Sequence, residues 1–163
     1  MSDLRPIVYS IHSAMRKGII GSGEMAELRR LHPQHPDRPA FWQVVVRWVE
    51  GQVPLSEEQI QRWAAVLQGW AVLGPNLHDP KCPLGRAMEK AGLAESRLSR
   101  LFRAPDPQFL EAAVRLCRFM RAKQEPLNWT DFAAWVLARD RDQFNDRIAQ
   151  DYYRAKLAKP KEV

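Results

Sequence analysis

The sequence predicts an all-α protein, a helical bundle in two halves. Apolar residues recur at intervals of three and four along most of the chain, which is the spacing of one helix face. No segment shows the strict apolar–polar alternation of a half-buried strand. Residues that start and stop helices fall at the ends of the periodic segments. A chain of 163 residues buries about two-thirds of the surface that its unfolded form exposes, so it needs no disulfide or metal to fold.

The first half, residues 1–74, contains four expected helices, at about 4–17, 22–31, 39–50 and 56–73. Ser22 is the expected N-cap of the second helix, and Ser56 with Gln59 forms a capping box at the fourth. Trp48 falls on the apolar face of the third helix, and Trp63 and Trp70 fall on that of the fourth. We therefore expect these three indole rings in the core and not on a surface where they could stack on bases.

Residues 75–82 are rich in turn formers and are the expected hinge between the halves. The second half, residues 83–159, contains five expected helices, beginning near positions 83, 94, 107, 128 and 141. Asp106 is the expected N-cap of the third of these, and Asn128 that of the fourth. Trp129 points inward by periodicity. Trp135 lies off that apolar stripe, so we expect it to pack against the other half or a partner protein.

The net charge of +6 is concentrated in one part of the chain. Residues 81–124 hold ten basic and four acidic side chains, which accounts for the whole excess, and elsewhere fifteen basic residues balance fifteen acidic ones. Arginine outnumbers lysine by 18 to 7, and its planar fork fits a phosphate better than the point charge of lysine does. Codon usage that favours arginine would explain the ratio but not the placement. The placement indicates a polyanionic partner.

Two rows of arginine recur at three-residue intervals on the expected helices that flank the short turn at residues 104–106. The rows are Arg97, Arg100 and Arg103, and Arg115, Arg118 and Arg121. Helices joined by so short a turn are expected to be neighbours, so the rows could line one positively charged groove. The alternative is a pair of solvated helix faces. Arg29 and Arg30 form a second basic spot, although a pair at a helix C-terminus also suits the helix dipole.

Patterns that would indicate an enzyme or a cofactor are absent or out of context. Residues 21–26 (GSGEMA) match a dinucleotide-binding fingerprint, but no strand precedes them. His32 and His35 lie in a proline-rich loop without a Cys or acidic partner at metal-ligand spacing. Asp140 and Asp142 lack companion carboxylates, and capping the last helix accounts for them. We therefore predict a protein without catalytic residues, metal or cofactor.

The expected location is the cytoplasm. Cys82 and Cys117 are too few for a disulfide framework and lack metal-site spacing. The apolar runs are far too short to span a membrane. The N-terminal residues do not have the pattern of a signal peptide.

A helix-turn-helix regulator of duplex DNA is the alternative function. Residues 91–95 followed by Leu98 resemble that motif, with glycine at the turn. A recognition helix usually presents short polar base readers at its start, where this chain has Glu95 and Ser96 and places its arginines further along. That arrangement favours contacts with the nucleic-acid backbone over base readout.

Three blocks of sequence carry a family resemblance, from about residue 20 to residue 155. The first is residues 23–30 (GEMAELRR), continued by 39–42 (PAFW); the second and most specific is 84–104 (LGRAMEKAGLAESRLSRLFRA); the third pairs 127–129 (LNW) with 147–153 (RIAQDYY). In these blocks the chain resembles the CasB family, the small subunit of the type I-E CRISPR surveillance complex Cascade.

The resemblance implies a non-catalytic, all-helical subunit of a ribonucleoprotein with CRISPR RNA. Expected partners are a second copy of the chain, the guide-RNA backbone subunits, the large subunit and target DNA, whose R-loop the basic face would help to keep open. The resemblance assigns phosphate contacts to Arg29, Arg30, Arg97, Arg103 and Arg115, whereas Arg100, Arg118 and Arg121 rest on spacing, and Arg139 and Arg141 lie in a loop that is basic in the family. The chain has Ala94 and Asn128 where the family commonly has Ser or Thr and Asp, departures that affect helix caps only.

Overall fold

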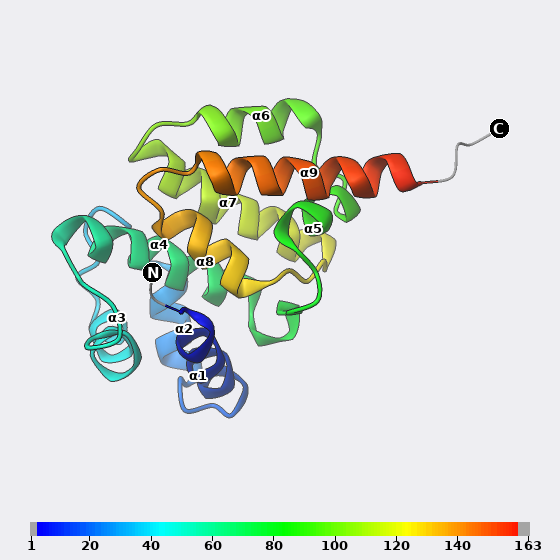
Figure 1. Cartoon of the computed structure of the whole chain (residues 1–163). Coiled ribbons are helices and arrows are strands. Elements are labelled where there is room, and N and C mark those ends of the chain that lie inside the picture. The colour runs from blue at the N-terminus through cyan, green and yellow to red at the C-terminus, as the bar shows by residue number, and fades with distance from the viewer. Residues whose placement is uncertain (1–2, 160–163) are drawn as a thin grey trace.

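The computed structural model describes residues 3–159, and helices account for all the regular structure in that range apart from two isolated β-bridges (Figure 1). The helices are α1 (Arg5–Arg16), α2 (Ser22–Arg29), α3 (Pro39–Val44), α4 (Glu57–Leu73), α5 (Leu84–Lys90), α6 (Glu95–Arg103), α7 (Gln108–Lys123), α8 (Trp129–Leu137) and α9 (Asp142–Ala158), with a π-helical turn at Val45–Val49 and a 3₁₀ turn at Pro75–Leu77. The prediction of an all-α fold is confirmed. None of these helices combines the length and the apolar character that crossing a bilayer requires.

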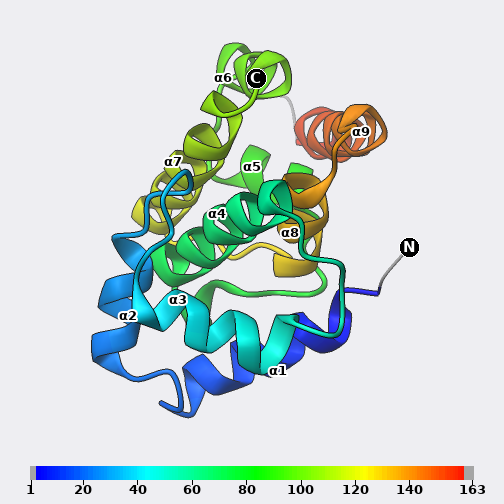
Figure 2. The same cartoon turned by 90° about the vertical axis from the view of Figure 1, so that its left-hand side faces the viewer.

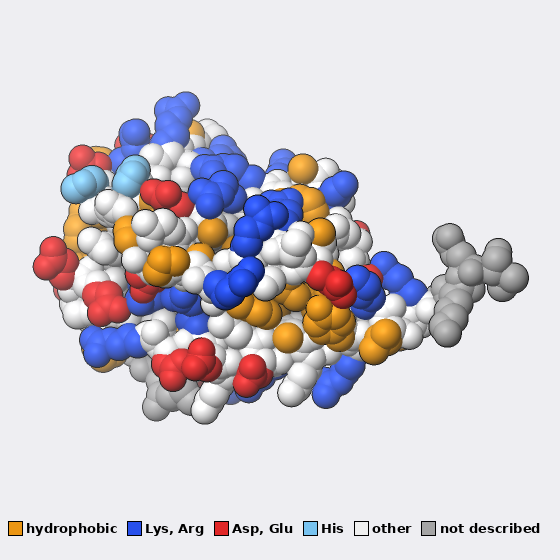
Figure 3. Space-filling model, turned by 90° about the horizontal axis from the view of Figure 1, so that it is seen from above, with side chains coloured by type: hydrophobic (Ala, Val, Ile, Leu, Met, Phe, Trp, Pro, Cys, Tyr) orange, Lys and Arg blue, Asp and Glu red, His pale blue; other side chains and the backbone are white. Residues whose placement is uncertain are grey.

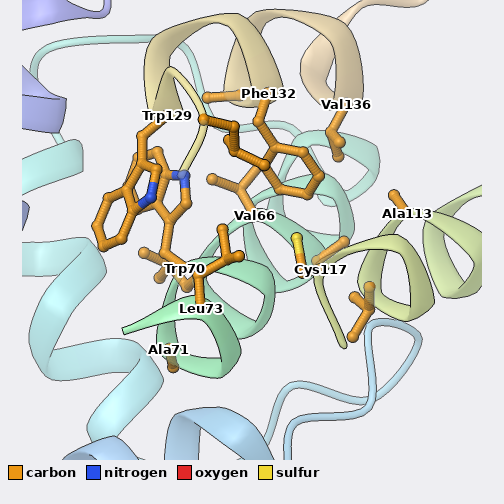
Figure 4. Close-up of a cluster of buried hydrophobic side chains, with 14 of the residues drawn as sticks. Val66, Trp70, Ala71, Leu73, Ala113, Cys117, Trp129, Phe132 and Val136 are labelled. Carbon is orange, nitrogen blue, oxygen red and sulfur yellow. The ribbon is translucent and has the colours of Figure 1, made fainter. Parts of the chain in front are cut away.

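Helix α4 is the centre of the molecule, because α7, α8 and α2 all pack against it. Its middle is nearly all buried, and the Trp70 ring stacks on that of Trp129 with centroids 5.2 Å apart (Figure 4). A Cβ at Gly69 would stand 2.9 Å from both the Cys117 sulfur and the Phe132 ring, so glycine lets α7 and α8 approach α4 closely. Burial raises the pKa of the Cys117 thiol, which therefore packs as a small neutral group.

The division of the chain into halves at residues 1–74 and 83–159 stays a prediction. Helix α4 of the first range packs on α7 and α8 of the second, so the two ranges share one core. The hinge region also pairs with the start of α8, where the Asp79 N–H donates to the Leu127 carbonyl at 2.9 Å. Residues 1 and 2 of the first range lie outside the described part of the chain.

Of the helix caps predicted at Ser22, Ser56, Asp106 and Asn128, two form and two do not. The Ser56 hydroxyl accepts the Gln59 N–H at 3.2 Å, and the Asn128 side chain accepts two N–H groups of the first turn of α8. The prediction for Ser22 is wrong, since Gly21 is the cap of α2 and Ser22 is already helical. The prediction for Asp106 is also wrong, because its carboxylate faces two arginines instead of the first turn of α7.

The third helix departs from α-helical periodicity, and this changes the burial of Trp48. After α3 the chain continues as a five-residue π-helical turn, Val45–Val49, whose buried residues are Val45 and Val49. Val49 therefore takes the core position that α-helical spacing gives to Trp48, and Trp48 is only half-buried. Trp48 nevertheless packs against the core, so its expected inward position holds in part.

Trp135 is a core residue. Its ring packs edge-on against Phe109 with centroids 4.8 Å apart, and its Nε1–H donates to Asn145 Oδ1 at 2.9 Å. Its complete burial contradicts the expectation that it faces a partner protein, and the contacts named here, with α7 and α9, lie within its own half.

A pair of histidines lies where α1, the hinge and α8 meet. The His12 and His78 ring centroids are 4.8 Å apart, and His12 Nε2 donates to the Pro75 carbonyl at 2.8 Å. His78 Nδ1 accepts the Trp129 N–H at 3.1 Å, which requires this nitrogen to carry no proton. Burial, and then the charge of His12, lower the pKa of His78, against smaller opposing effects of the Leu127 carbonyl and Asp79.

Stability should therefore depend on pH through His78. The unfolded chain binds a proton on this ring at a higher pH than the folded chain does, so the free energy of unfolding should rise as the pH rises to about 6.5 and level off above it. The slope contributed by one such group is at most about 1.4 kcal/mol per pH unit. Urea unfolding from about pH 5 to pH 8 measures it. His78→Asn should flatten the profile and His35→Asn, in an exposed loop, should not; a His78→Asn profile as steep as the wild type would contradict the assignment.

Candidate nucleic-acid interface

Helix α6, which carries the first arginine row, stands away from the central helices and runs antiparallel to α9. Figure 1 shows α6 and α9 one beside the other at the top of the molecule, and Figure 2 looks nearly along both axes. The buried residues of α6 are few, Leu98 and Leu101, so its position depends on how its ends are held.

The start of α6 is held by the end of α9. The Tyr152 hydroxyl donates to the Leu93 carbonyl at 2.5 Å, and Lys156 forms an ion pair with Glu95 at 3.1 Å. Helix α9 itself packs against α5 at Gly85, where an added Cβ would stand 2.1 Å from the Ile148 carbonyl oxygen. Glycine is therefore required at this helix crossing.

The end of α6 is held by Arg141, the residue that precedes α9. Its Nη2 donates to the Ala104 carbonyl at 2.8 Å, its Nη1 is 3.1 Å from Asp106 Oδ1, and its guanidinium carbon lies 3.6 Å from the Phe109 ring centroid. The buried Arg62 of α4 binds the other oxygen of Asp106 at 2.5 Å. This network explains why Asp106 is no helix cap, since its carboxylate fixes the turn between α6 and α7.

Between α6 and α7 lies a groove of about 290 Å³. Its floor is apolar, and its polar lining consists of three arginines and one amide. The apolar residues are Leu93, Leu101, Ala104, Ala112 and Leu116, and the polar ones are Arg97, Arg100, Arg115 and Gln108. The predicted groove between the two arginine rows is thus present, with Arg97, Arg100 and Arg115 brought together around it.

These three guanidinium groups have no acidic partner among residues 3–159, where every ion pair involves other side chains. Arg97 lies over the Phe119 ring, 4.9 Å from its centroid, and Arg100 makes only a long bond to its own helix. Figure 3 shows Lys and Arg side chains gathered on the face seen from above, where α6 lies. Because nearby like charges repel, such a cluster binds an anion favourably.

The basic surface continues from the groove toward the first half of the chain. Arg115 also lines a second hollow of about 220 Å³, shared with Arg118, His32 and one acid, Glu111. Beyond it, the exposed Arg29 donates from Nε to the Ala71 carbonyl at 3.2 Å, next to Arg30. The second basic spot is therefore tied to α4 through Arg29.

The remaining predicted arginines lie elsewhere. Arg103 is exposed on α6 but does not line the groove. Arg121 donates from Nη1 to the Leu73 carbonyl at 2.8 Å and so caps the end of α4. Arg139 is exposed, 3.7 Å from Glu58. The Arg141 side chain is only 12% exposed and holds the α6–α7 turn, so the structure gives it a role within the fold.

Sequence reasoning missed two residues of this site. Gln108 brings an amide to the groove, and Phe119 carries both Arg97 and Lys123 over its ring, the latter with Nζ 5.8 Å from the centroid. Phe119 follows Arg115 by four residues, the spacing of one helix face, and this was the available signal.

The helix-turn-helix alternative is not supported by the geometry. The start of α6, which a recognition helix would present to DNA, is already contacted by α9, through Tyr152 at the Leu93 carbonyl and Lys156 at Glu95. Helix α5 packs on α9 and not on α6 as the first helix of that motif would.

Comparisons with known proteins show the family and, independently, the fold. A model of the family described as CRISPR-associated protein Cse2 (CRISPR_cse2) matches residues 24–153. A chain of E. coli Cascade, crystallised bound to a PAM-containing dsDNA target, has a similar fold, with a TM-score of 0.72 at 22% identity over 93% of this chain and 97% of that one. CasB from Thermobifida fusca has a TM-score of 0.62 at 15% identity over 91% and 96%. A sequence search of curated proteins finds no match. At these identities the two structures show the fold alone.

Replacing Gly85 should loosen the support of α6. Gly85→Ala places a methyl group against the α9 backbone, so we expect a loss of about 1–3 kcal/mol in unfolding free energy and faster amide hydrogen exchange in residues 91–104. Gly23→Ala is the matched control, because Gly23 holds the same second position of its helix with open space around it; it should be neutral or stabilising by up to about 1 kcal/mol. Equal stabilities of the two variants would show that α9 does not depend on this close approach.

Proposed function

The chain belongs to the CRISPR-associated protein Cse2 family, and from this we propose that it is the small subunit of a type I-E Cascade ribonucleoprotein that holds nucleic-acid backbone in the groove between α6 and α7. One observation carries the proposal: Arg97, Arg100 and Arg115 surround a single groove with no carboxylate of the described chain paired to them. A site with this composition is suited to phosphate groups.

Weak backbone contacts suffice for the proposed role. When a guide RNA invades a DNA duplex, the base pairs gained and lost are nearly balanced in energy, so contacts with the strand backbones decide whether the R-loop stays open. In the proposal the groove supplies such contacts to target DNA, and the second hollow with Arg118, Arg29 and Arg30 extends the track. Arg103 and Arg139 remain candidate contacts at its edges.

The proposed partners follow from family membership and from the complex that contains the related chain, E. coli Cascade bound to a dsDNA target. They are the guide-RNA backbone subunits, the large subunit, the CRISPR RNA complex, target DNA and a second copy of the chain. We further propose that the subunit is non-catalytic, works without metal or cofactor, and resides in the cytoplasm.

The number of bound phosphates should depend on the groove arginines. The double variant Arg97→Ala and Arg115→Ala should weaken binding of a single strand and lower the slope of log K against log salt by ~1.4, since each phosphate contact contributes ~0.7. Arg121→Ala is the control, because Arg121 lines neither the groove nor the second hollow and its guanidinium caps α4 at the Leu73 carbonyl, so the slope of this variant should match the wild type. Fluorescence anisotropy titrations at several salt concentrations measure both.

The double variant should also fail to stabilise the R-loop of a reconstituted complex while still assembling with it, because the groove arginines are assigned to DNA and not to the assembly. An unchanged salt slope together with an intact R-loop would contradict the placement of the site. A chain that does not co-purify with a CRISPR RNA complex would contradict the proposed role as a whole.

A further inference from the structure

We propose that the outward side of α3 and of the π-helical turn after it is a docking surface for another protein subunit of the ribonucleoprotein. This surface, the α3 face, consists of Trp42, Val46, Arg47 and the half-buried Trp48. Its role rests on the proposed function and adds the surface by which the chain joins the assembly. The α3 face shares no residue with the groove between α6 and α7 or with the second hollow.

Exposed apolar side chains are the first observation. Trp42 is 42% exposed and Val46 is 59% exposed, and their spacing of four residues places them on one side of the helical segment. Other residues of the same segment belong to the core, where Phe41, Val45 and Val49 are buried. Single exposed apolar residues are common on protein surfaces, but a tryptophan with a neighbouring valine forms a patch that is favourable to cover.

An ordered arginine beside this patch is the second observation. The guanidinium carbon of Arg47 lies 4.7 Å from the centroid of the Trp48 ring, and this stacking holds the cation in place. Arg47 forms no ion pair with another side chain of residues 3–159, so it is free to bind a carboxylate from outside the chain. Tryptophan and arginine are the residues that most often dominate the binding energy of protein interfaces.

The backbone of the α3 face is the third observation. Val45–Val49 is a π-helical turn, a rare conformation that is frequent at functional sites. Val45 and Val49 are its buried ends, and between them Val46 and Arg47 are exposed. The core contacts of both ends fix the turn, so the side chains that it presents need little ordering when a partner binds.

Charge favours a protein over a nucleic acid as the occupant. Residues 81–124 carry the whole net charge of +6, whereas α3 belongs to the part of the chain in which basic and acidic residues balance. A nucleic acid needs several cations, and the α3 face has one, Arg47, with the exposed Glu50 three residues later. Tryptophan with few charges is typical of the centre of a protein interface. The partner that fits has an apolar surface with a carboxylate, and this acidic character favours it over a second copy of the basic chain.

The test measures how tightly the full-length chain binds the CRISPR RNA complex assembled from the other subunits. Trp42→Ala should weaken this binding by about tenfold or more, as loss of a central interface tryptophan does. Leu157→Ala is the control, because Leu157 is 82% exposed at the end of α9, which Figure 1 and Figure 2 place on a different side of the molecule from α3. The affinity of this control should match the wild type. A folded Trp42→Ala variant that binds as tightly as the wild type would overturn the inference.

Charge reversal tests the carboxylate of the partner and leaves the apolar patch in place. Arg47→Glu should weaken binding more than Arg47→Gln does, because the new charge repels that carboxylate. Arg154→Glu, at an exposed position of α9, is the matched control and should bind as the wild type does. Equal affinities of the two Arg47 variants would overturn the acidic character of the partner.

Two further measurements separate this surface from other occupants. Trp42→Ala should bind a single-stranded oligonucleotide with the affinity and salt slope of the wild type; a loss of both in a folded variant would assign the α3 face to nucleic acid and overturn the inference. The isolated wild type and Trp42→Ala should sediment alike, whereas a wild-type dimer that dissociates in the variant would assign the face to a second copy. If the wild-type chain itself does not join the complex, the proposed function fails and the inference fails with it.

Discussion

The suspension of α6 at both ends is the constraint on which the basic site depends. A helix of nine residues with two buried side chains has too little apolar surface to fix its own position. Tyr152 and Lys156 hold its first turn, and Arg141 with Asp106 holds its last. All of these contacts except that of Asp106 come from α9 or from the residue before it. Helix α9 therefore fixes the position of α6, which forms one side of the groove, relative to α7.

This construction separates the charges that build the fold from those that are free to bind. Arg62, Arg121 and Arg141 donate to carbonyl groups or carboxylates of the chain itself, and each ties one element to another. Arg97, Arg100 and Arg115 have no carboxylate partner in the part of the chain that the structure describes, and the long bond of Arg100 to the Ser96 carbonyl stays within its own helix. These three groups repel one another by a few tenths of a kcal/mol per pair. Because their helices are already fixed, little order has to be created when an anion binds.

The sequence predicts those parts of the fold that depend on local patterns. The helices, the caps at Ser56 and Asn128, and the neighbouring arginine rows follow from spacing and residue type. The wrong predictions depend on contacts or backbone geometry that no local pattern shows. Asp106 has the sequence context of a cap but is engaged by Arg62, 44 residues away, and by Arg141. Trp48 is left half-buried by a π-helical turn that no single residue predicts. The Trp135 Nε1–H donates to Asn145 of the next helix.

The most direct test of the account is a structure of the full-length chain with a single-stranded oligonucleotide bound. The account predicts phosphate groups within hydrogen-bond distance of Arg97, Arg100 or Arg115, with α6 and its contacts to Tyr152 and Arg141 unmoved. A strand bound to another face, with the groove empty and these arginines in solvent, would contradict it.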